Sequence, residues 1–439
     1  MSRIPDRLQQ WFEVQRHRGQ VHVARQSGNW PRLQAGQVLM KMLACGICGA
    51  DIRAATGNKL TSGDPDRYVT LGHEGVGVVV AVDNGVTGLK PGDYAVVLPH
   101  IRPGSAHKFD VRCSALQVDP VCIGSGHTLH MGWDINGCFT DFMVVPATNL
   151  LRVAPEYLRL ATKLAPGLKG AIFAVVEPML CTLSAYEIME MQVKKLYQRD
   201  LMPGRALIIG SGPIGILHGL VLLKRGFEVW FTDTLTKRAA LAQWCAGDRS
   251  HVLDAKKGHA GFDLVMVTAS SAQAIRMGEA LVRDGGIVYL FAGLNAAERA
   301  AMDPGSVFFY EQLHRTARSI LTTTRLFQGD KLVLYLGHSG YFERLAHEAI
   351  AAVATNAAGL DRAITGIIPG WPSSRIISRL PGGVDWITED SSPAILSVLN
   401  GTDLRDRHCK LLVLANDQSR KLDLFSRVQK CSNDSMESL

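Results

Sequence analysis

The sequence predicts an α/β protein in which a β-rich domain adjoins a doubly wound parallel sheet. Residues 204–233 read as a strand, a glycine turn, a helix and a second strand. Beyond them, apolar runs of strand length alternate with helical stretches, as far as residues 287–291. Such alternation is typical of a parallel sheet with helices on its faces. Earlier in the chain, short β runs separated by Gly and Pro favour a compact, barrel-like β domain.

The glycine turn has the spacing G-x-G-x-x-G, at Gly210, Gly212 and Gly215. It follows a strand, opens a helix and precedes an acidic residue about 20 positions on, which is the context of a dinucleotide site. In such a site the first glycine permits the turn, the second admits a pyrophosphate, and the third lets helix pack on strand. Pro213 and Ile214 begin the helix, whose unpaired N–H groups face the anion. The alternative is an ordinary α/β turn with glycines for geometry alone.

The acidic residue is Asp233, at the end of the second strand. A carboxylate there accepts hydrogen bonds from the adenosine ribose and repels a 2′-phosphate, so NAD is favoured as the cofactor. Lys237 and Arg238 follow closely and could meet a phosphate, which leaves NADP open.

Composition narrows the class of protein. With 439 residues, 47% of them hydrophobic, the chain can form two domains with a large core. A formal charge of +7 is small for this length, so we expect no nucleic-acid partner. The most apolar run lies in the dinucleotide unit, where a buried strand and helix explain it better than a membrane span. Nine scattered cysteines favour a reducing, cytoplasmic location.

Four residues have side chains suited to binding a metal: Cys48, His73, Glu74 and Glu177. A thiolate, an imidazole and carboxylates that converge on one point make a zinc site, and a catalytic zinc keeps one position open. Periodicity does not show that these residues meet. A single Cys or His is more often a core residue than a ligand.

Five motifs occur in order along the chain: GICGAD, GHEGVGVV, LKPGD, VVEP and GSGPIG. In this order and spacing, over about residues 35–300, they resemble the zinc-dependent medium-chain alcohol and polyol dehydrogenases. The sorbitol and threonine dehydrogenase branches are the most similar, because Glu177 stands at the third metal position, where the main alcohol dehydrogenase branch has Cys.

The resemblance implies a fold and a domain order. Both ends of the chain, residues 1–179 and 320–439, would form a β-rich GroES-like catalytic domain. Residues 180–319 would form an inserted Rossmann domain that binds NAD, with the active site in the cleft between the domains. The second catalytic segment would carry an extra insertion and a polar C-terminal tail, since the chain is longer than a typical member.

The resemblance also assigns roles to the metal-directed residues. Cys48 and His73 would be direct zinc ligands, and Glu177 a direct or water-bridged one. Glu74 would be a neighbouring carboxylate that reaches the metal in some states. Asp51 would orient His73 through its other ring nitrogen.

Further expectations come from the same resemblance. Gly293 sits where the backbone of family members meets the nicotinamide carboxamide. Cys45 is not at the ligand position and is expected to be structural. The partners would be a small-molecule substrate and further copies of the chain, in a homodimer or homotetramer.

Two departures from the family pattern affect the chemistry. Ala50 stands where members usually carry Ser or Thr to pass the substrate proton toward solvent. Cys113, Cys122 and Cys138 do not have the spacing of the structural zinc of the family, so we expect one catalytic zinc and no structural zinc.

Three functions remain open from the sequence. The first is a zinc- and NAD-dependent dehydrogenase of a secondary alcohol, such as a polyol, cyclitol or amino-alcohol. The second, motivated by Ala50, is a reductase of an iminium or a conjugated carbonyl. The third is a non-catalytic protein that binds a dinucleotide, against which the metal-directed residues count.

Overall fold

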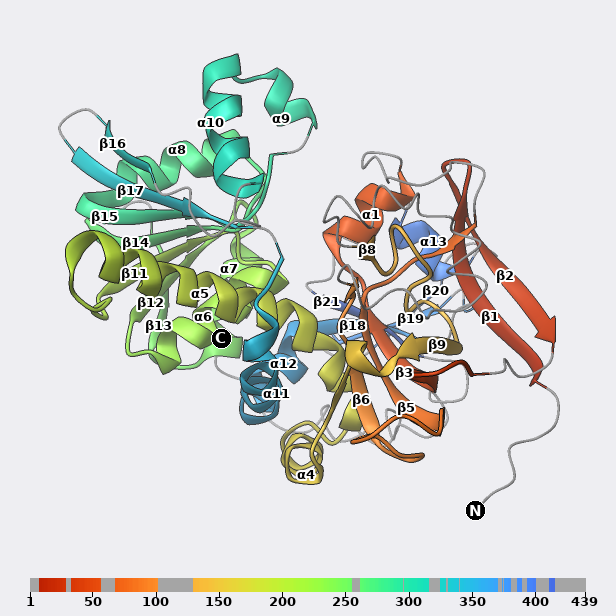
Figure 1. Ribbon diagram of the computed structural model, residues 1–439. Helices are drawn as coiled ribbons and strands as arrows, with labels where there is room; N and C mark the ends of the chain where they lie inside the picture. Colours follow the sequence, from red (N-terminus) through yellow and green to blue (C-terminus); the bar gives the residue numbers. More distant parts are fainter. Residues whose placement is uncertain are drawn as a thin grey trace. The chain divides into compact units, whose positions relative to one another are not determined.

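Figure 1 shows the computed structural model of the chain, which forms two compact units. The first unit is Met1–Glu177 with Val353–Leu439, and the second unit is Pro178–Ala352. The structure describes all residues except 1–7, 29–32, 57–67, 102–128, 255–260, 295, 316–323, 329–330, 339, 370–372, 374, 380–384, 389–392, 400–409 and 415–439.

The second unit is built on one sheet. Its strands, in spatial order, are β13 (Ser250–Val252), β12 (Glu228–Thr232), β11 (Arg205–Ile209), β14 (Phe262–Val267), β15 (Val282–Leu290), β17 (Lys331–Gly337) and β16 (Thr324–Gln328). Neighbouring strands pair in parallel as far as β17, and β16 pairs antiparallel with β17. Numbered along the chain, the parallel strands have the order 3-2-1-4-5-6 of the dinucleotide-binding fold. The prediction of a doubly wound parallel sheet is confirmed.

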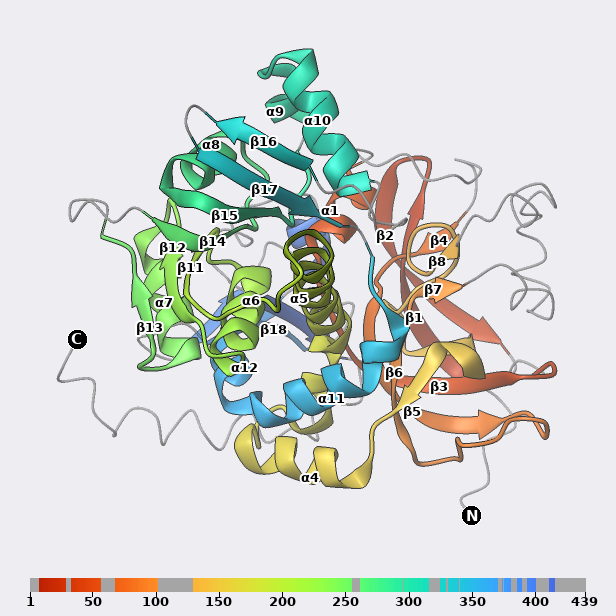
Figure 2. The same cartoon turned by 60° about the vertical axis from the view of Figure 1, so that its left-hand side comes forward.

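Helices cover both faces of this sheet. Figures 1 and 2 show two of them on one face, α8 (Ala272–Leu281) and α10 (Pro304–Arg315), and two on the other, α5 (Val176–Tyr197) and α6 (Pro213–Lys224). Next to α6 lies α7 (Thr236–Ala246), and the short α9 (Ala296–Ala300) precedes α10. Residues 215–223 of α6 are all buried, which explains why this helix is apolar on every side.

One helical stretch, Lys169–Tyr197, is long and apolar enough to cross a membrane by length and composition. However, 89% of its apolar window is buried inside the protein. A core helix has the same composition as a membrane span, and burial of this extent is what a core helix needs.

The first unit is organised by β3 (Gln37–Gly46). This strand pairs antiparallel with β5 (Glu74–Val82), with β9 (Phe142–Pro146) and with β21 (Lys410–Leu414). The other strands of the same sheet are β6 (Tyr94–Val97), β10 (Leu150–Arg152), β18 (Ile364–Ile368), β19 (Arg375–Ser378) and β20 (Asp385–Thr388). The predicted polar tail lies outside the described residues, which end with β21.

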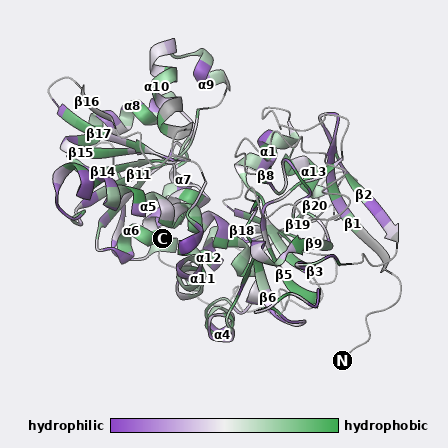
Figure 3. Cartoon of the chain, viewed as in Figure 1, coloured by the Kyte–Doolittle hydropathy of each residue, from purple (hydrophilic) through white to green (hydrophobic). Residues whose placement is uncertain are grey.

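Smaller elements complete the first unit. The strands are β1 (Leu8–His17), β2 (Gln20–Gly28), β4 (Val69–Thr70), β7 (His100–Ile101) and β8 (Leu129–His130). The helices are α1 (Gly49–Ala55), α4 (Pro155–Leu164), α12 (Ala357–Ala363) and α13 (Ala394–Leu399). Along the chain, the boundary between the two units falls within α11 (Ala346–Thr355). Met40, Val97 and Phe139 are fully buried in its core. Figure 3 shows hydrophobic residues along strands of both sheets. The predicted β-rich, GroES-like domain is confirmed.

The second domain boundary differs from the predicted one. The sequence places the return to the β-rich domain at residue 320, whereas the second unit continues to Ala352. The reason is β17, which pairs in parallel with β15 and so belongs to the dinucleotide-binding sheet. This pairing joins segments far apart in the chain, and the local pattern of residues does not reveal it.

The third glycine of the turn packs α6 against β11 and offers a test of the fold. A Cβ at Gly215 would lie 2.1 Å from the carbonyl oxygen of Gly210. We expect Gly215→Ala to lower the free energy of unfolding by about 1–3 kcal/mol, because backbone atoms must shift to admit the methyl group. Urea denaturation followed by circular dichroism measures the change.

Gly212→Ala is the matched control. Its backbone φ is −73°, and a Cβ there would meet nothing within 4 Å. We therefore expect its unfolding free energy to stay within about 0.5 kcal/mol of the wild type. NAD binding should nevertheless weaken, because the added methyl occupies the space that a pyrophosphate approaches. Equal destabilisation by the two substitutions would contradict this account of the turn.

Candidate functional site

Three of the predicted metal ligands lie together in the first unit. Cys48 caps the N-terminus of α1, His73 directly precedes β5, and Glu74 is the first residue of β5. Their ligand atoms all lie within 4.8 Å of one another. The pairing of β3 with β5 sets this arrangement, since Gly46 at the end of β3 stands opposite Glu74. A Cβ at Gly46 would collide with the Glu74 carboxylate, so the close approach requires glycine.

One buried carboxylate positions two of these ligands. Asp51 is fully buried, and its Oδ2 accepts a hydrogen bond from the backbone N–H of Cys48 at 2.8 Å. Its Oδ1 lies 3.0 Å from Nδ1 of His73. Because Nδ1 faces this carboxylate, Nε2 is the nitrogen available to a metal. The role that the resemblance implies for Asp51 agrees with this geometry.

The charge of Asp51 also affects protonation of His73. Burial lowers the pKa of His73, but the neighbouring Asp51, together with Cys48, outweighs it and raises the pKa well above its ordinary value. A carboxylate that favours positive charge on the imidazole also favours a cation bound to Nε2.

Lys410 lies at the metal group, although its sequence position did not point to it. Its ammonium group is buried, pairs with Oε2 of Glu74 and donates a hydrogen bond to the carbonyl of Ile47 at 3.1 Å. Burial lowers the pKa of Lys410, but Glu74 outweighs it and the pKa is raised. The one signal in the sequence was a lysine that begins the apolar strand β21, 336 residues from Glu74.

The donor set fits zinc. Thiolate sulfur, imidazole nitrogen and carboxylate oxygen are the groups that bind zinc in proteins. With a Cys48 thiolate, the carboxylates of Asp51 and Glu74 and the cation of Lys410 leave two negative charges, which a divalent cation neutralises. Three ligands also leave one position for a substrate, as in catalytic zinc sites.

The remaining residues expected near the metal are placed as follows. Glu177 lies in the first turn of α5 and is not part of the group within 4.8 Å, so its role as a direct or water-bridged ligand stays a prediction. Ala50 is buried in the first turn of α1, beside the sulfur of Cys48. Cys45 is fully buried, and burial raises the pKa of its thiol, which agrees with a structural role. Cys113 and Cys122 lie outside the described residues.

The predicted dinucleotide turn lies at the carboxyl ends of β11 and β12. Gly210 has a φ of +101°, which favours glycine, and Gly212 caps α6, with Pro213 and Ile214 in its first turn. Asp233 accepts a hydrogen bond from the N–H of Ser211 at 2.8 Å. The carboxylate expected to bind a ribose therefore also holds the turn.

Two further predicted cofactor residues lie at the same end of this sheet. Arg238 is in the first turn of α7, after Asp233, and its backbone N–H donates to the carbonyl of Leu235 at 2.8 Å. Gly293 follows the end of β15. Ligands of such sheets bind outside the carboxyl ends of the strands, so both placements agree with cofactor contact.

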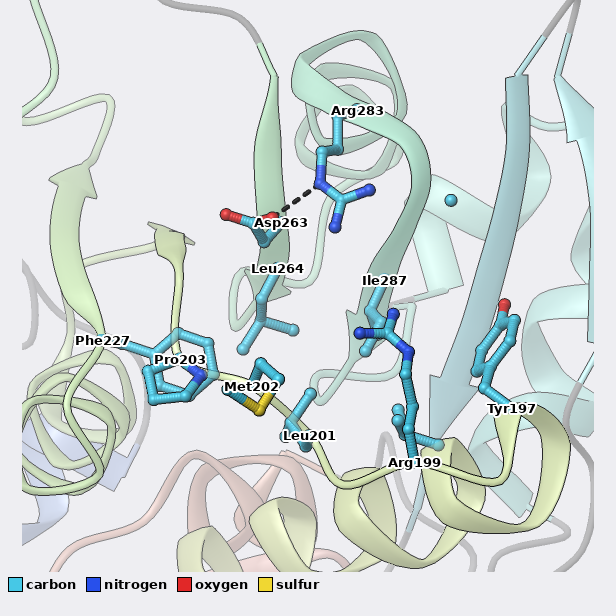
Figure 4. Close-up of a pocket in the computed structure, with 12 residues that line it drawn as sticks. Tyr197, Arg199, Leu201, Met202, Pro203, Phe227, Asp263, Leu264, Arg283 and Ile287 are labelled. Atoms are coloured by element: carbon cyan, nitrogen blue, oxygen red, sulfur yellow. Dashed lines mark hydrogen bonds and ion pairs between the residues drawn. The ribbon is translucent and has the colours of Figure 1, made fainter.

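The second unit also contains a cavity of about 80 Å³, which does not lie at the predicted dinucleotide turn. Figure 4 shows its lining, with the ion pair between Asp263 and Arg283 (2.6 Å) and with Arg199 and Met202 nearby. Asp263 stands at the amino end of β14, whereas dinucleotides bind at carboxyl ends. This cavity is therefore not the cofactor site.

The fold and the site together define a class: two-unit oxidoreductases with a zinc site in a GroES-like domain and a dinucleotide site in a parallel sheet. Comparison with known proteins supports this class. Residues 34–155 match the alcohol dehydrogenase GroES-like domain. Glucose 1-dehydrogenase 2 of Vulcanisaeta moutnovskia is 29% identical over 60% of this chain and 69% of the relative. L-threonine 3-dehydrogenase of Pyrococcus horikoshii is 27% identical over 69% of this chain and 83% of the relative. D-altritol 5-dehydrogenase of Agrobacterium fabrum is 28% identical over 63% of this chain and 75% of the relative.

Solved structures share the fold. 2R,3R-butanediol dehydrogenase from Bacillus subtilis superposes with a TM-score of 0.61 at 19% identity, over 92% of this chain and all of that one. A putative zinc-binding dehydrogenase from Sinorhizobium meliloti, bound to NADP, superposes with a TM-score of 0.62 at 20% identity, over 92% of this chain and 99% of that one. The match of the GroES-like domain and the curated relatives agree with the resemblance of the chain's motifs to the zinc-containing medium-chain dehydrogenases.

The contribution of the ion pair between Glu74 and Lys410 to protein stability can be tested by substitution. Lys410→Met leaves a buried carboxylate without its cation. We expect a loss of about 3–5 kcal/mol in the free energy of unfolding, because an uncompensated buried charge is costly. Urea denaturation measures the loss, and zinc affinity should be measured in parallel.

Two further variants serve as controls. The double variant Lys410→Met with Glu74→Gln should recover most of the stability, because neither position of the buried ion pair then carries a charge. Lys194 pairs with Asp200 on the surface, so Lys194→Met should change stability by less than about 1 kcal/mol. If Lys410→Met is no more destabilising than Lys194→Met, the buried ion pair does not stabilise the site.

Proposed function

We propose that this protein is a zinc- and NAD-dependent dehydrogenase that interconverts a secondary alcohol and its ketone. The observation that carries the proposal is the group of Cys48, His73 and Glu74, with Asp51 hydrogen-bonded to His73, in a chain that also holds a dinucleotide turn. A protein that only binds a dinucleotide has no use for this group. The non-catalytic alternative is therefore disfavoured.

The residues of the first unit would hold one zinc ion. When bound, zinc acts as a Lewis acid that lowers the pKa of an alcohol oxygen, as it does for water. Asp51 keeps the imidazole of His73 oriented, and Lys410 holds the carboxylate of Glu74. Burial of these residues excludes water and strengthens their electrostatic interactions.

The second unit would bind the cofactor. NAD supplies the hydride acceptor for alcohol oxidation and, reduced, the donor for the reverse reaction. The turn at Gly212 and the N-terminus of α6 would bind the pyrophosphate, and Asp233 the adenosine ribose. Because Arg238 lies just after Asp233, NADP is the alternative cofactor.

The substrate would be a polyol, cyclitol or amino-alcohol. The relatives named above are dehydrogenases of glucose, altritol and threonine, each of which carries a second polar group beside a hydroxyl. We also propose that the protein works in the cytoplasm as a homodimer or homotetramer.

Replacing a zinc ligand tests the function. Cys48→Ser and His73→Ala should lose zinc, as measured by mass spectrometry, and lower alcohol-dependent NAD reduction by at least about 100-fold, since the metal supplies the activation of the alcohol. Cys45→Ala is the matched control and should keep both, because this buried thiol lies outside the metal group. Full turnover by Cys48→Ser or His73→Ala would refute zinc catalysis at this site.

Ala50 favours a second candidate, the reduction of an iminium or a conjugated carbonyl. Its methyl group cannot relay a proton, and such a reduction needs no protonated oxygen. Ala50→Ser separates the two reactions. If alcohol oxidation is the natural reaction, the new hydroxyl should raise its kcat, by up to about tenfold, because it restores a proton route. An unchanged kcat together with turnover of an iminium or enone would favour the reductase.

A further inference from the structure

The cavity beside the ion pair of Asp263 and Arg283 has an apolar floor. Four of its lining side chains are apolar and at most 6% exposed: Val193, Phe227, Leu264 and Ile287. Because about 10–15 Å³ suffices for one water molecule, a cavity of about 80 Å³ holds several non-hydrogen atoms. Apolar side chains offer water none of the about two to four polar partners that it needs. This part of the cavity therefore suits hydrocarbon.

Arg283 is held in place at the edge of this cavity. Its Nε donates a hydrogen bond to Oδ1 of Asp263 at 2.6 Å, and its Nη1 donates to the carbonyl of Asp284 at 2.7 Å. The other carboxylate oxygen of Asp263 accepts a hydrogen bond from the N–H of Arg205 at 2.7 Å. These bonds fix the guanidinium group before any ligand binds, which lowers the entropy cost of binding.

Arg199 brings a second guanidinium group to the same cavity. Figure 4 shows its side chain extending toward Ile287, on the side of the cavity where Arg283 lies. In the part of the chain that the structure describes, this group lies 5.7 Å from the ring centroid of Tyr197, and no carboxylate pairs with it. A guanidinium group without a carboxylate partner has donors left for a planar anion.

The charges that line the cavity indicate which anion fits. Burial raises the pKa of Asp263, but the N–H of Arg205 and the guanidinium group of Arg283 outweigh it and lower the pKa, so the carboxylate stays ionised at neutral pH. Arg199 and Arg283 together with Asp263 then leave one positive charge. A phosphate monoester carries about 1.5 to 2 negative charges at neutral pH, and Asp263 would repel it. A carboxylate carries one and matches the cavity.

We propose that this cavity is a binding site for a small apolar monocarboxylic acid, such as a short-chain fatty acid. The carboxylate pairs with Arg199 and Arg283, and the hydrocarbon chain packs on Leu264 and Ile287. The site is separate from the dinucleotide turn, because it borders the amino end of β14, whereas the turn lies at carboxyl ends of the same sheet. The inference concerns a second ligand and does not depend on the proposed dehydrogenase activity.

Three probes separate the contributions of charge and hydrocarbon. Pentanamide matches pentanoate in size without its charge, and acetate keeps the charge without the chain. Each probe is titrated into the zinc-loaded protein at fixed ionic strength, and binding is followed by saturation-transfer NMR. We expect pentanoate to bind with a dissociation constant of about 1–10 mM, since a ligand of this size makes few contacts. It should bind at least about tenfold more tightly than acetate, because it buries three more methylene groups.

Substitution of Arg199 tests the cation. Arg199→Gln should weaken pentanoate binding at least about fivefold and leave pentanamide binding unchanged, because only the anion loses a partner. Lys195→Gln is the matched control, since Lys195 is exposed on α5 and does not line the cavity. Its effect on pentanoate should stay within about twofold, as for a distant surface charge screened by salt. Melting temperatures show that both variants are folded.

A carboxylate can also bind zinc, so the titration is repeated with Cys48→Ser and with saturating NAD. Pentanoate binding should persist in both. If Cys48→Ser abolishes binding, or if NAD displaces pentanoate, the acid binds at the metal or cofactor site and the inference is wrong. Equal affinity for pentanoate and pentanamide, equal effects of Arg199→Gln and Lys195→Gln, or no detectable binding of pentanoate would also refute it. None of these outcomes bears on alcohol oxidation.

Discussion

The pairings of β3 are the constraint on which the metal site depends. This strand leads directly into the turn of Cys48, and its last residue stands opposite Glu74 on β5. On its other side it pairs with β21, which carries Lys410. Three segments far apart in the chain thus meet at the end of one strand. Because the backbone hydrogen bonds fix the register, the donor atoms are set before any metal binds.

A second carboxylate has a similar double role in the other unit. Asp233 accepts a hydrogen bond from the N–H of Ser211 in the glycine turn and is also the residue expected to bind the ribose. Asp51 likewise joins the N–H of Cys48 to the ring of His73. In both places one acidic side chain serves the local backbone and the ligand. A substitution at either residue would disturb geometry and recognition together.

The parts of the structure that the sequence predicted are those carried by local patterns. The turn from Gly210 to Gly215 was predicted from its spacing, and it forms as expected. Cys48 and His73 were assigned through the family resemblance of the short motifs that contain them, and the structure brings the two side chains together. The alternation of apolar runs of strand length with helical stretches predicted the parallel sheet, and it too is a local pattern. Local signals of this kind depend only on residues within a few turns of one another.

The parts that were missed depend on contacts between distant segments. β17 joins the sheet by pairing with β15, which no local pattern encodes, so the domain boundary was placed too early. Lys410 was missed because its partner Glu74 is 336 residues away. His130 lies beside His73 only because β7 pairs with β8 and its ring stacks on Trp133.

The separation of Lys410 from Glu74 along the chain has a consequence for biosynthesis. During translation Cys48, His73 and Glu74 leave the ribosome well before the lysine that balances Glu74, which follows 336 residues later. Until β21 inserts beside β3, the site contains an unbalanced acidic group, and β3 lacks this strand partner. Completion of the metal site is thereby tied to the synthesis of β21. A chain terminated before β21 would keep the three ligands and lack the finished site.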